Sequence, residues 1–210
     1  GKINMNVSNK SEYKLYGIPY LGSMVIQFLM EELNIKYEII FPSQEERNST
    51  EFKKISPRGL VPALITPTGH SIFEVLAIIN FLLETHENKL IAPIGDPDRS
   101  FCFQWLSFLS TALGNANNRF FFPDRYGSTD QIIKTQAELD RKSCYDILEK
   151  NINTFLSGKN FGIADFYFYM FMQWDENKTL ELSKRPKINA IYNHIDKKAS
   201  IQKVMNNQNA

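Results

Sequence analysis

A Val-Pro dipeptide and a glutamate that follows it carry the clearest chemistry in this sequence. Val61-Pro62 opens an apolar segment typical of a β-strand, and proline has no N–H, so it needs an edge strand or a first position. An X-Pro bond adopts the cis form at modest cost, and a cis-Pro62 leaves the N–H and C=O of Val61 free to pair with an extended peptide. Glu74 stands where the next helix begins, close to backbone N–H groups that lack partners within the helix. The pattern predicts a surface that binds peptide backbone next to a carboxylate.

The elements that must position these residues follow from periodicity in the first half of the chain. Short alternating segments rich in aromatic and β-branched residues predict strands, and apolar residues at helical spacing predict helices. The expected elements, in chain order, are a strand at 13–16, a helix from Ser23 to about Leu33, a strand at 37–40, a loop with a short helix at 43–54, a strand pair around Pro62 and Ile72, and a helix at 75–85. The order is therefore β-α-β-α-β-β-α, with Ser23 as the expected cap of the first helix.

The second half shows helical periodicity and no strand signal. Residues 88–97 hold two prolines and a glycine, which is typical of a linker. Apolar residues at helical spacing follow it in four stripes. These stripes are Phe101, Trp105, Phe108 and Ala112; Ile133, Ala137, Cys144, Leu148 and Phe155; Ile163, Phe166, Met170 and Trp174; and Ile188, Ile191, Tyr192 and Ile195. The predicted organisation is a polar tail at 1–12, an α/β domain at 13–87, a linker at 88–97 and an all-α domain at 98–210.

Composition and charge exclude several classes of function. Hydrophobic residues make up 43% of the chain and charged residues 22%, which is ordinary for a folded domain. The net charge of +1 gives no electrostatic case for a nucleic-acid or membrane partner, and no apolar run approaches the roughly 20 residues that span a bilayer. Cys102 and Cys144 lie in separate helical stripes without a CxxC pattern, so we expect two buried thiols in a reducing cytoplasm and no metal site.

The segment around Val61-Pro62 resembles the glutathione-binding half of the glutathione S-transferase family. The family pattern is N/S-P-x-G-x-V-P-x-L, a turn, and then E/Q-S-x-A-I. This chain has Ser56-Pro57-Arg58-Gly59-Leu60-Val61-Pro62-Ala63-Leu64, followed by Glu74-Val75-Leu76-Ala77-Ile78. The resemblance covers about residues 13–205 and implies a thioredoxin-like N-terminal domain joined to a C-terminal helical-bundle domain.

An enzyme of this family must stabilise the thiolate of its co-substrate glutathione, whose thiol is mostly protonated at neutral pH. A hydroxyl that donates to sulfur lowers the pKa of the thiol, and a helix N-terminus helps further. The resemblance implies that this hydroxyl lies between the first strand and first helix, where Ser23, Tyr16 and Tyr20 are candidates, in that order of preference. Each has a plainer interpretation: Ser23 as a helix cap, Tyr16 as a core aromatic residue and Tyr20 as a loop aromatic residue. The Cys-Ser of bacterial beta-class enzymes is replaced by Gly22-Ser23.

The resemblance also implies which residues bind the tripeptide. Val61 and Pro62 would pair with the cysteinyl backbone, and Glu74 would bind the γ-glutamyl ammonium group. Val75 replaces the family serine, so only its backbone N–H remains for the γ-glutamyl carboxylate. Leu60 stands where many members have Lys or Gln for the glycyl end. The missing hydroxyl predicts weaker glutathione binding, by about tenfold or more.

Two features of the second half bear on the same resemblance. Phe108, Phe120, Phe121 and Phe122 would line an apolar pocket for the second substrate, or else pack between helices or at a dimer contact. The segment from Gly162 to Asp165 matches the family's capping box S/T-x-A-D, with glycine in place of the hydroxyl residue. We interpret Asp165 as structural. The His-Lys pair that beta-class enzymes have in the first helix of this half is absent.

The resemblance therefore implies a cytoplasmic, homodimeric glutathione S-transferase with a detoxification role. It would activate the glutathione thiol for attack on a small apolar electrophile or a peroxide. The alternative is a non-catalytic protein of the same fold, as bacterial stringent-starvation regulators and elongation-factor subunits are, and Val75 and Leu60 favour that alternative. A thiol-disulfide enzyme of this fold would need a cysteine near residues 20–23, and none is present.

Overall fold

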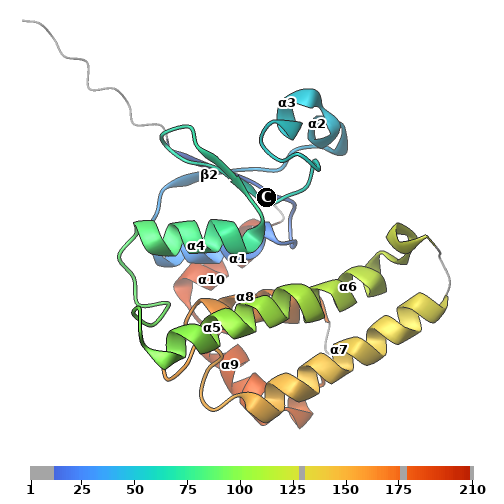
Figure 1. Cartoon of the computed structure of the whole chain (residues 1–210). Helices are drawn as coiled ribbons and strands as arrows, with labels where there is room; N and C mark the ends of the chain where they lie inside the picture. The colour runs from blue at the N-terminus through green and yellow to red at the C-terminus, as the bar shows by residue number, and fades with distance from the viewer. Residues whose placement is uncertain (1–11, 128–130, 176–178, 209–210) are drawn as a thin grey trace, which may run out of the picture.

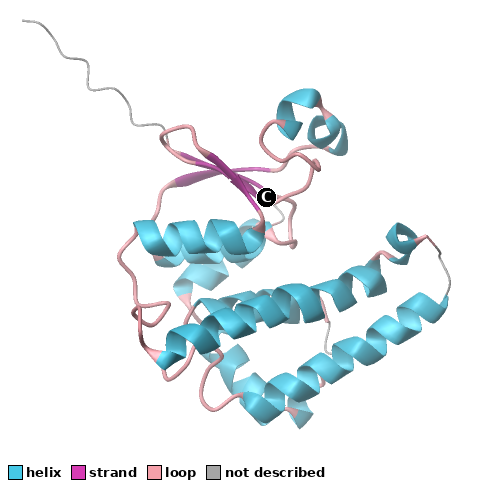
Figure 2. Ribbon diagram, viewed as in Figure 1, coloured by secondary structure: helices cyan, strands magenta, loops and turns pink. Residues whose placement is uncertain are grey.

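The structure, a computed structural model, describes residues 12–127, 131–175 and 179–208. The predicted polar tail therefore lies outside the described residues, apart from Glu12. In chain order the first half contains β1 (Tyr13–Tyr16), α1 (Ser23–Glu32), β2 (Tyr37–Ile40), α2 (Gln44–Asn48), α3 (Thr50–Lys53), β3 (Ala63–Ile65), β4 (Ser71–Phe73) and α4 (Val75–Thr85). This order confirms the predicted α/β half, and the second half contributes helices, as Figure 2 shows.

The sheet has the order β2-β1-β3-β4, with β1 parallel to β2 and the other two pairings antiparallel. Leu15 of β1 pairs in register with Leu64 of β3, and both side chains are fully buried. Figure 1 shows α1 and α4 side by side along one face of this sheet, with α2 and α3 lying apart from them. The thioredoxin-like arrangement that the resemblance implied is confirmed.

Helix α1 lies between the sheet and the helices of the second half, which explains why it is buried on all sides from Ser23 to Met30. The ring of Phe28 lies 6.4 Å from that of Phe166 and 5.8 Å from that of Tyr169, measured between centroids. The α/β half and the helical half therefore share one continuous core.

The second half is helical in all its described elements, and its central helix is buried throughout. The elements are α5 (Pro97–Phe108), the π-helical turn η1 (Leu109–Leu113), α6 (Gly114–Phe121), the 3-10 turn η2 (Pro123–Tyr126), α7 (Gln131–Asn151), α8 (Ile163–Met172), the 3-10 turn η3 (Leu182–Lys184), α9 (Pro186–Asp196) and α10 (Ala199–Asn207). Every residue of α8 is buried. The division of the chain at residues 88–97 remains our proposal.

The buried face of α5 differs from the stripe that periodicity selected. Cys102, Leu106, Leu109 and Leu113 form the buried face of this helix and η1, whereas Phe101 is half exposed and Trp105, Phe108 and Ala112 are only partly buried. Apolar residues occupy two neighbouring faces here, so helical spacing alone did not identify the one that meets α8. Cys102 and Cys144 are buried free thiols, as expected, and burial raises the pKa of each to about 11.

The start of α8 is a closed structural cap. The carboxylate of Asp165 accepts hydrogen bonds from the backbone N–H groups of Leu156 (2.7 Å), Gly162 (2.9 Å) and Ser157 (3.3 Å). The Ser157 hydroxyl accepts from the N–H of Ala164, so it supplies the acceptor that Gly162 lacks. Burial raises the pKa of Asp165 to about 6, against the opposing effect of these hydrogen bonds. The contacts support the structural role expected for Asp165.

A Cβ atom at position 162 would lie 2.1 Å from the carbonyl oxygen of Leu90 and 2.8 Å from the Cβ of Ser157. Only glycine fits between these two groups, so the space available explains why the cap position has no hydroxyl side chain.

Candidate active site

Three segments that are far apart in the sequence meet at the start of α1. A Cβ atom on Gly22, the N-cap of α1, would lie 3.3 Å from Pro62 and 3.3 Å from Val75. Pro62 precedes β3, and Val75 is the first residue of α4. Two helix N-termini therefore converge beside the Val61-Pro62 segment, and each offers unpaired N–H groups and a positive end of the helix dipole to an anion.

A cleft of about 750 Å³ opens at this junction, between the α/β half and the helical half. Its α/β wall consists of Ile18, Tyr20, Leu21, Gly22, Gln44, Arg47, Asn48, Arg58, Gly59, Leu60, Val61, Pro62 and Val75. Its helical wall consists of Ser110, Gly114, Asn117, Asn118, Phe121, Phe122, Arg125, Tyr167, Met170, Phe171, Gln173 and Trp174. A cleft of this size suits a small organic ligand.

The Val61-Pro62 peptide bond is cis. Val61 makes no backbone hydrogen bond with any residue that the structure describes, although β3 begins only two residues later and pairs with β1. Its N–H and C=O therefore have free hydrogen-bonding capacity at the cleft wall, as an edge strand has. Pro62 itself is buried, and Leu60 is 47% exposed at the same wall.

Glu74 has an unusual backbone conformation at the start of α4. Its φ is 75° and its ψ is 125°, and it is exposed. The N-terminus of α4 receives no side-chain cap. A left-handed φ costs a non-glycine residue about 1–3 kcal/mol, and such residues cluster at functional sites. The unpaired N–H groups of this helix start thus lie next to a carboxylate held in a costly conformation.

The charged side chains that line the cleft are all cationic among the described residues. Arg47 and Arg58 come from the α/β half, and Arg125 comes from η2, where its guanidinium lies 4.1 Å from the ring centroid of Phe122. Gly59 has a φ of 66°, and a Cβ there would lie 2.5 Å from the carbonyl oxygen of Arg47. Glycine is therefore required directly after Arg58, where the chain passes close to the backbone of Arg47. The three arginines make the cleft favour an anionic ligand.

The three candidate hydroxyls lie in different surroundings. Ser23 is fully buried and its hydroxyl donates to the Ile18 carbonyl (3.2 Å), so its predicted role as cap of α1 was wrong: Gly22 takes that position. Tyr16 packs edge-on against Phe52, with ring centroids 5.4 Å apart. Tyr20 lines the cleft, and the other two do not.

The helical wall combines aromatic and polar groups. Phe121 and Phe122 line it as expected, but Phe108 packs against Trp105, and Phe120 lies under the guanidinium of Arg141.

Spacing along the sequence missed two rows of residues in the helical wall of the cleft. One row is Ser110, Gly114 and Asn117, which leads to the expected Phe121; the other is Tyr167, Met170, Phe171 and Trp174. Both rows repeat at helical spacing, which was a usable signal, but each runs beside a longer core stripe.

Asn117 differs from the rest of this wall because its amide is unpaired. The residue is 1% exposed, and neither its Oδ1 nor its Nδ2 has a hydrogen-bond partner among the described residues. Buried amides are normally paired, so Asn117 is a costly polar group at the base of the cleft. The described residues include no cluster of three or more His, Cys, Asp or Glu side chains that could hold a metal ion.

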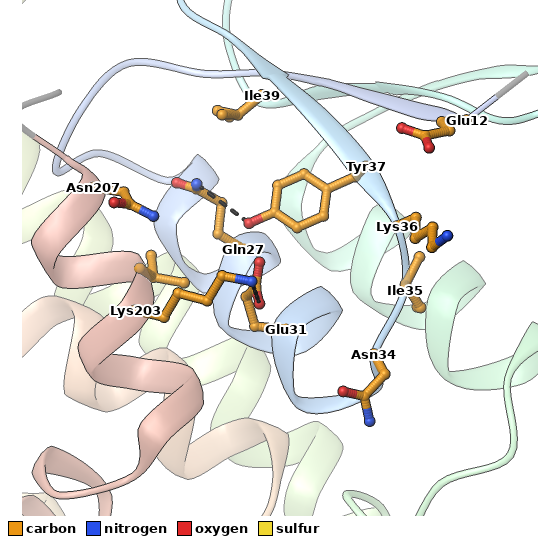
Figure 3. A pocket seen from close by; sticks show the side chains of 11 residues that line it. Glu12, Gln27, Glu31, Asn34, Ile35, Lys36, Tyr37, Ile39, Lys203 and Asn207 are labelled. Atoms are coloured by element: carbon orange, nitrogen blue, oxygen red, sulfur yellow. Dashed lines mark hydrogen bonds and ion pairs between the residues drawn. The ribbon is translucent and has the colours of Figure 1, made fainter.

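A second cavity of about 460 Å³ lies at the other end of α1, between β2 and α10 (Figure 3). It is lined by Glu12, Gln27, Glu31, Asn34, Ile35, Lys36, Tyr37, Ile39, Lys203, Val204 and Asn207. Lys203 and Glu31 form an ion pair of 2.8 Å there. The side chain of Gln27 reaches from α1 to the Tyr37 hydroxyl, with a donor–acceptor distance of 3.5 Å.

The sequence of this chain is similar to that of known glutathione S-transferases. Residues 11–84 match the family described as glutathione S-transferase, N-terminal domain. The Escherichia coli O157:H7 protein named glutathione S-transferase GstA is 25% identical over 156 residues, covering 74% of this chain and 77% of that protein.

Two solved structures share the fold of both halves. Glutathione transferase URE2P8 from Phanerochaete chrysosporium, solved with oxidized glutathione, has a TM-score of 0.86 and 22% identity over 96% of this chain and 97% of that one. A glutathione transferase homolog from Sulfitobacter with bound glutathione has a TM-score of 0.83 and 20% identity, covering 93% and 97% of the two chains. In the part of the chain that the structure describes, no helix is long and apolar enough to cross a membrane.

Proposed function

We propose that this chain is a glutathione S-transferase, which binds glutathione in the cleft and activates its thiol for attack on an electrophile; the match of residues 11–84 to the N-terminal domain of that family supports the proposal. One observation carries the proposal: the unpaired backbone of Val61 lies beside two uncapped helix N-termini. A peptide backbone paired with Val61 would place its flanking anionic groups near the starts of α1 and α4.

In the proposed complex each part of glutathione has a partner. The cysteinyl backbone pairs with Val61 beside Pro62, and Glu74 binds the γ-glutamyl ammonium group. The N–H of Val75 binds the γ-glutamyl carboxylate. Arg47 or Arg58 binds the glycyl carboxylate, since Leu60 offers only its backbone there. This pairing uses the cationic character of the cleft, because glutathione carries a net negative charge.

We propose Tyr20 as the hydroxyl that stabilises the thiolate, because it lines the cleft beside the start of α1. Ser23 and Tyr16 are the alternatives. Ser23 would have to turn away from the Ile18 carbonyl, and Tyr16 would have to leave Phe52. The activated sulfur would form a bond to an electrophilic carbon, and the leaving group would depart with the bonding electron pair. The aromatic helical wall suits a small apolar electrophile. With a peroxide, the same thiolate would form a bond to one oxygen as the O–O bond breaks, and the other oxygen would leave with the electron pair and take up a proton.

The oligomeric state, the compartment and the biological role expected from the sequence remain part of the proposal. We propose that the chain acts as a homodimer in the reducing cytoplasm, in detoxification. The half-exposed Phe73 and Phe101 supply apolar surface for such a dimer, and the two buried free thiols suit a reducing compartment. The rival function, a non-catalytic protein of the same fold, is favoured by Val75 and Leu60, which remove two side-chain contacts to glutathione.

Isothermal titration calorimetry with glutathione separates the two functions. We expect binding by the unchanged chain and weakening by about tenfold or more in Glu74→Ala, which loses a charged hydrogen bond. Absence of binding at millimolar glutathione would contradict the enzyme and support the scaffold. A conjugation assay of Tyr20→Phe, Ser23→Ala and Tyr16→Phe then identifies the activating hydroxyl. If all three keep the full rate, none of the three hydroxyls activates the thiol.

A further inference from the structure

The cleft residue Tyr20 has a backbone conformation that the loop alone does not stabilise. Its φ is 63°, in the left-handed region that non-glycine residues seldom adopt. A conformation of this kind persists only where contacts with the surrounding structure stabilise it. The relevant surroundings of Tyr20 belong to the other half of the molecule.

Both backbone polar groups of Tyr20 are bound by side chains from the helical half. The N–H of Tyr20 donates to the Oε1 of Gln208, at 3.0 Å. The C=O of Tyr20 accepts a hydrogen bond from the indole Nε1–H of Trp174. Gln208 follows the end of α10, and Trp174 follows the end of α8. Two helix ends of the second half therefore fix one peptide segment of the first.

Gln208 is itself held in place, which makes it a rigid partner. It is 2% exposed, and its Nε2 donates to the Oε1 of Gln27 (3.0 Å) and to the carbonyl of Val204 (3.1 Å). Gln27 is also 2% exposed, and its Nε2 donates to the Tyr37 hydroxyl at the second cavity. A continuous hydrogen-bond chain therefore runs from Tyr37 through Gln27 and Gln208 to the backbone of Tyr20.

We infer that Gln208 and Trp174 are positioning residues for the thiol-activating loop, with the chain through Gln27 and Tyr37 as their support. The inference rests on the proposed function. By holding the peptide groups of Tyr20, they fix the direction in which its side chain leaves the backbone at the start of α1. We call the two hydrogen bonds from Gln208 and Trp174 to the backbone of Tyr20 the clamp. The residues proposed to bind the tripeptide, Val61 and Glu74, lie on other segments and do not depend on it.

The test compares Gln208→Leu with Gln208→Glu, and with Asn206→Leu as a matched control on an exposed position of α10. Gln208→Leu keeps the side-chain bulk and removes the acceptor for Tyr20. We expect kcat to fall between about twofold and tenfold, the effect of one hydrogen bond. We also expect the pKa of the bound glutathione thiol, followed by thiolate absorbance against pH, to rise by up to about one unit, with KM for glutathione unchanged.

Gln208→Glu restores an acceptor for the N–H of Tyr20, and the amide of Gln27 can turn its NH2 toward the new carboxylate. Recovery of the thiol pKa in this variant would distinguish positioning from a general loss of stability. Trp174→Phe provides a second variant: it removes the donor to Tyr20 but keeps a ring against Phe171. It should shift the thiol pKa in the same direction. Asn206→Leu should change neither kcat nor the thiol pKa.

Hydrogen exchange of the Tyr20 amide in the glutathione-free protein gives a readout that needs no activity. We expect about tenfold faster exchange in Gln208→Leu than in the unchanged chain. Unchanged exchange would overturn the clamp. Faster exchange with an unchanged thiol pKa and kcat would overturn the positioning role while leaving the proposed function standing. Absence of glutathione binding by the unchanged chain would contradict the proposed function, and the positioning role with it.

Discussion

The helices α4 and α8 differ in whether side chains bind the backbone N–H groups at their N-termini. At α8, Asp165 and Ser157 bind the available donors, and every group involved is buried. At α4, no side chain caps the helix, and the residue in the cap position, Glu74, is exposed with a φ of 75°. One helix start is closed and without strain, and the other is open and strained.

The difference teaches how to separate structural from functional helix starts. A closed cap stabilises the fold by satisfying its own donors, so changing it should cost stability first. An open start leaves its donors for a ligand, so changing it should alter binding and cost the fold little. Four substitutions test this contrast.

Asp165→Ala should have the largest effect. It removes the acceptor of three buried N–H groups, and each unpaired group costs about 1–3 kcal/mol, so we expect the free energy of unfolding to fall by at least about 3 kcal/mol. Chemical denaturation measures this loss. Asp165→Asn keeps one carbonyl oxygen and should lose less. A loss under 1 kcal/mol in the alanine variant would show that the cap is not the structural element described.

Gly162→Ala should lower the free energy of unfolding by about 1–3 kcal/mol, the usual cost of forcing a methyl group into filled space. The new Cβ meets the Leu90 carbonyl at 2.1 Å, so the connection to α5 must shift. Chemical denaturation of Gly162→Ala is compared with that of Ser157→Ala, which weakens the same cap by removing a hydroxyl but introduces no steric clash. The comparison separates the cost of the clash from the cost of a weakened cap. If the variant is as stable as the unchanged chain, the contact with Leu90 is not tight.

Glu74→Gly should weaken glutathione binding without weakening the fold. Glycine adopts a positive φ without strain, so we expect unchanged stability or a gain of up to about 1 kcal/mol. Glutathione affinity should fall about tenfold or more with the loss of the carboxylate. Thermal unfolding and calorimetry on the same preparations check both effects, with Glu74→Gln as a variant that removes only the charge. A loss of stability as large as that of Asp165→Ala would contradict the distinction between the open start of α4 and the closed cap of α8.

Val75→Ser should have the smallest effect on the fold and should improve binding. The added hydroxyl lies at the open end of α4 and can donate to the γ-glutamyl carboxylate, so we expect affinity to rise by about tenfold. Calorimetry with Val75→Ala as the control separates the hydroxyl from the loss of two methyl groups. Equal affinity in the serine and alanine variants would place the carboxylate elsewhere.

The sequence predicted the fold well because its signals are local. The strands and the helices of the second half each carry their own periodicity, and the Val61-Pro62 segment carries the spacing of a known family. It also predicted the closed cap at α8, although the reason for Gly162, the nearby Leu90 carbonyl, depends on a contact between distant segments.

The candidate site was harder to predict because its geometry depends on contacts between the two halves. Ser23 stands at a typical cap position, yet Gly22 occupies the N-cap position of α1 and the Ser23 hydroxyl turns back to Ile18. The clamp on Tyr20 joins residues that are 188 and 154 positions apart, and no local pattern reveals such a contact. Which aromatic residues reach the cleft depends on the rotation of each helix, which spacing leaves open.

The π-helical turn at Leu109–Leu113 makes the cleft tolerant of one change in chain length. A wider turn of this kind holds one residue more than the α-helical turn it replaces. Deleting a single residue from this turn would restore a regular helix, in which four residues at about 100° each complete nearly the rotation that the wider turn completes with five. Asn117 and Phe121 would then stay at the cleft wall, and Cys102 and Leu106 would keep their places in the core. The same deletion within the regular turns of α6 would rotate the residues after it by about 100° and change the lining of the cleft.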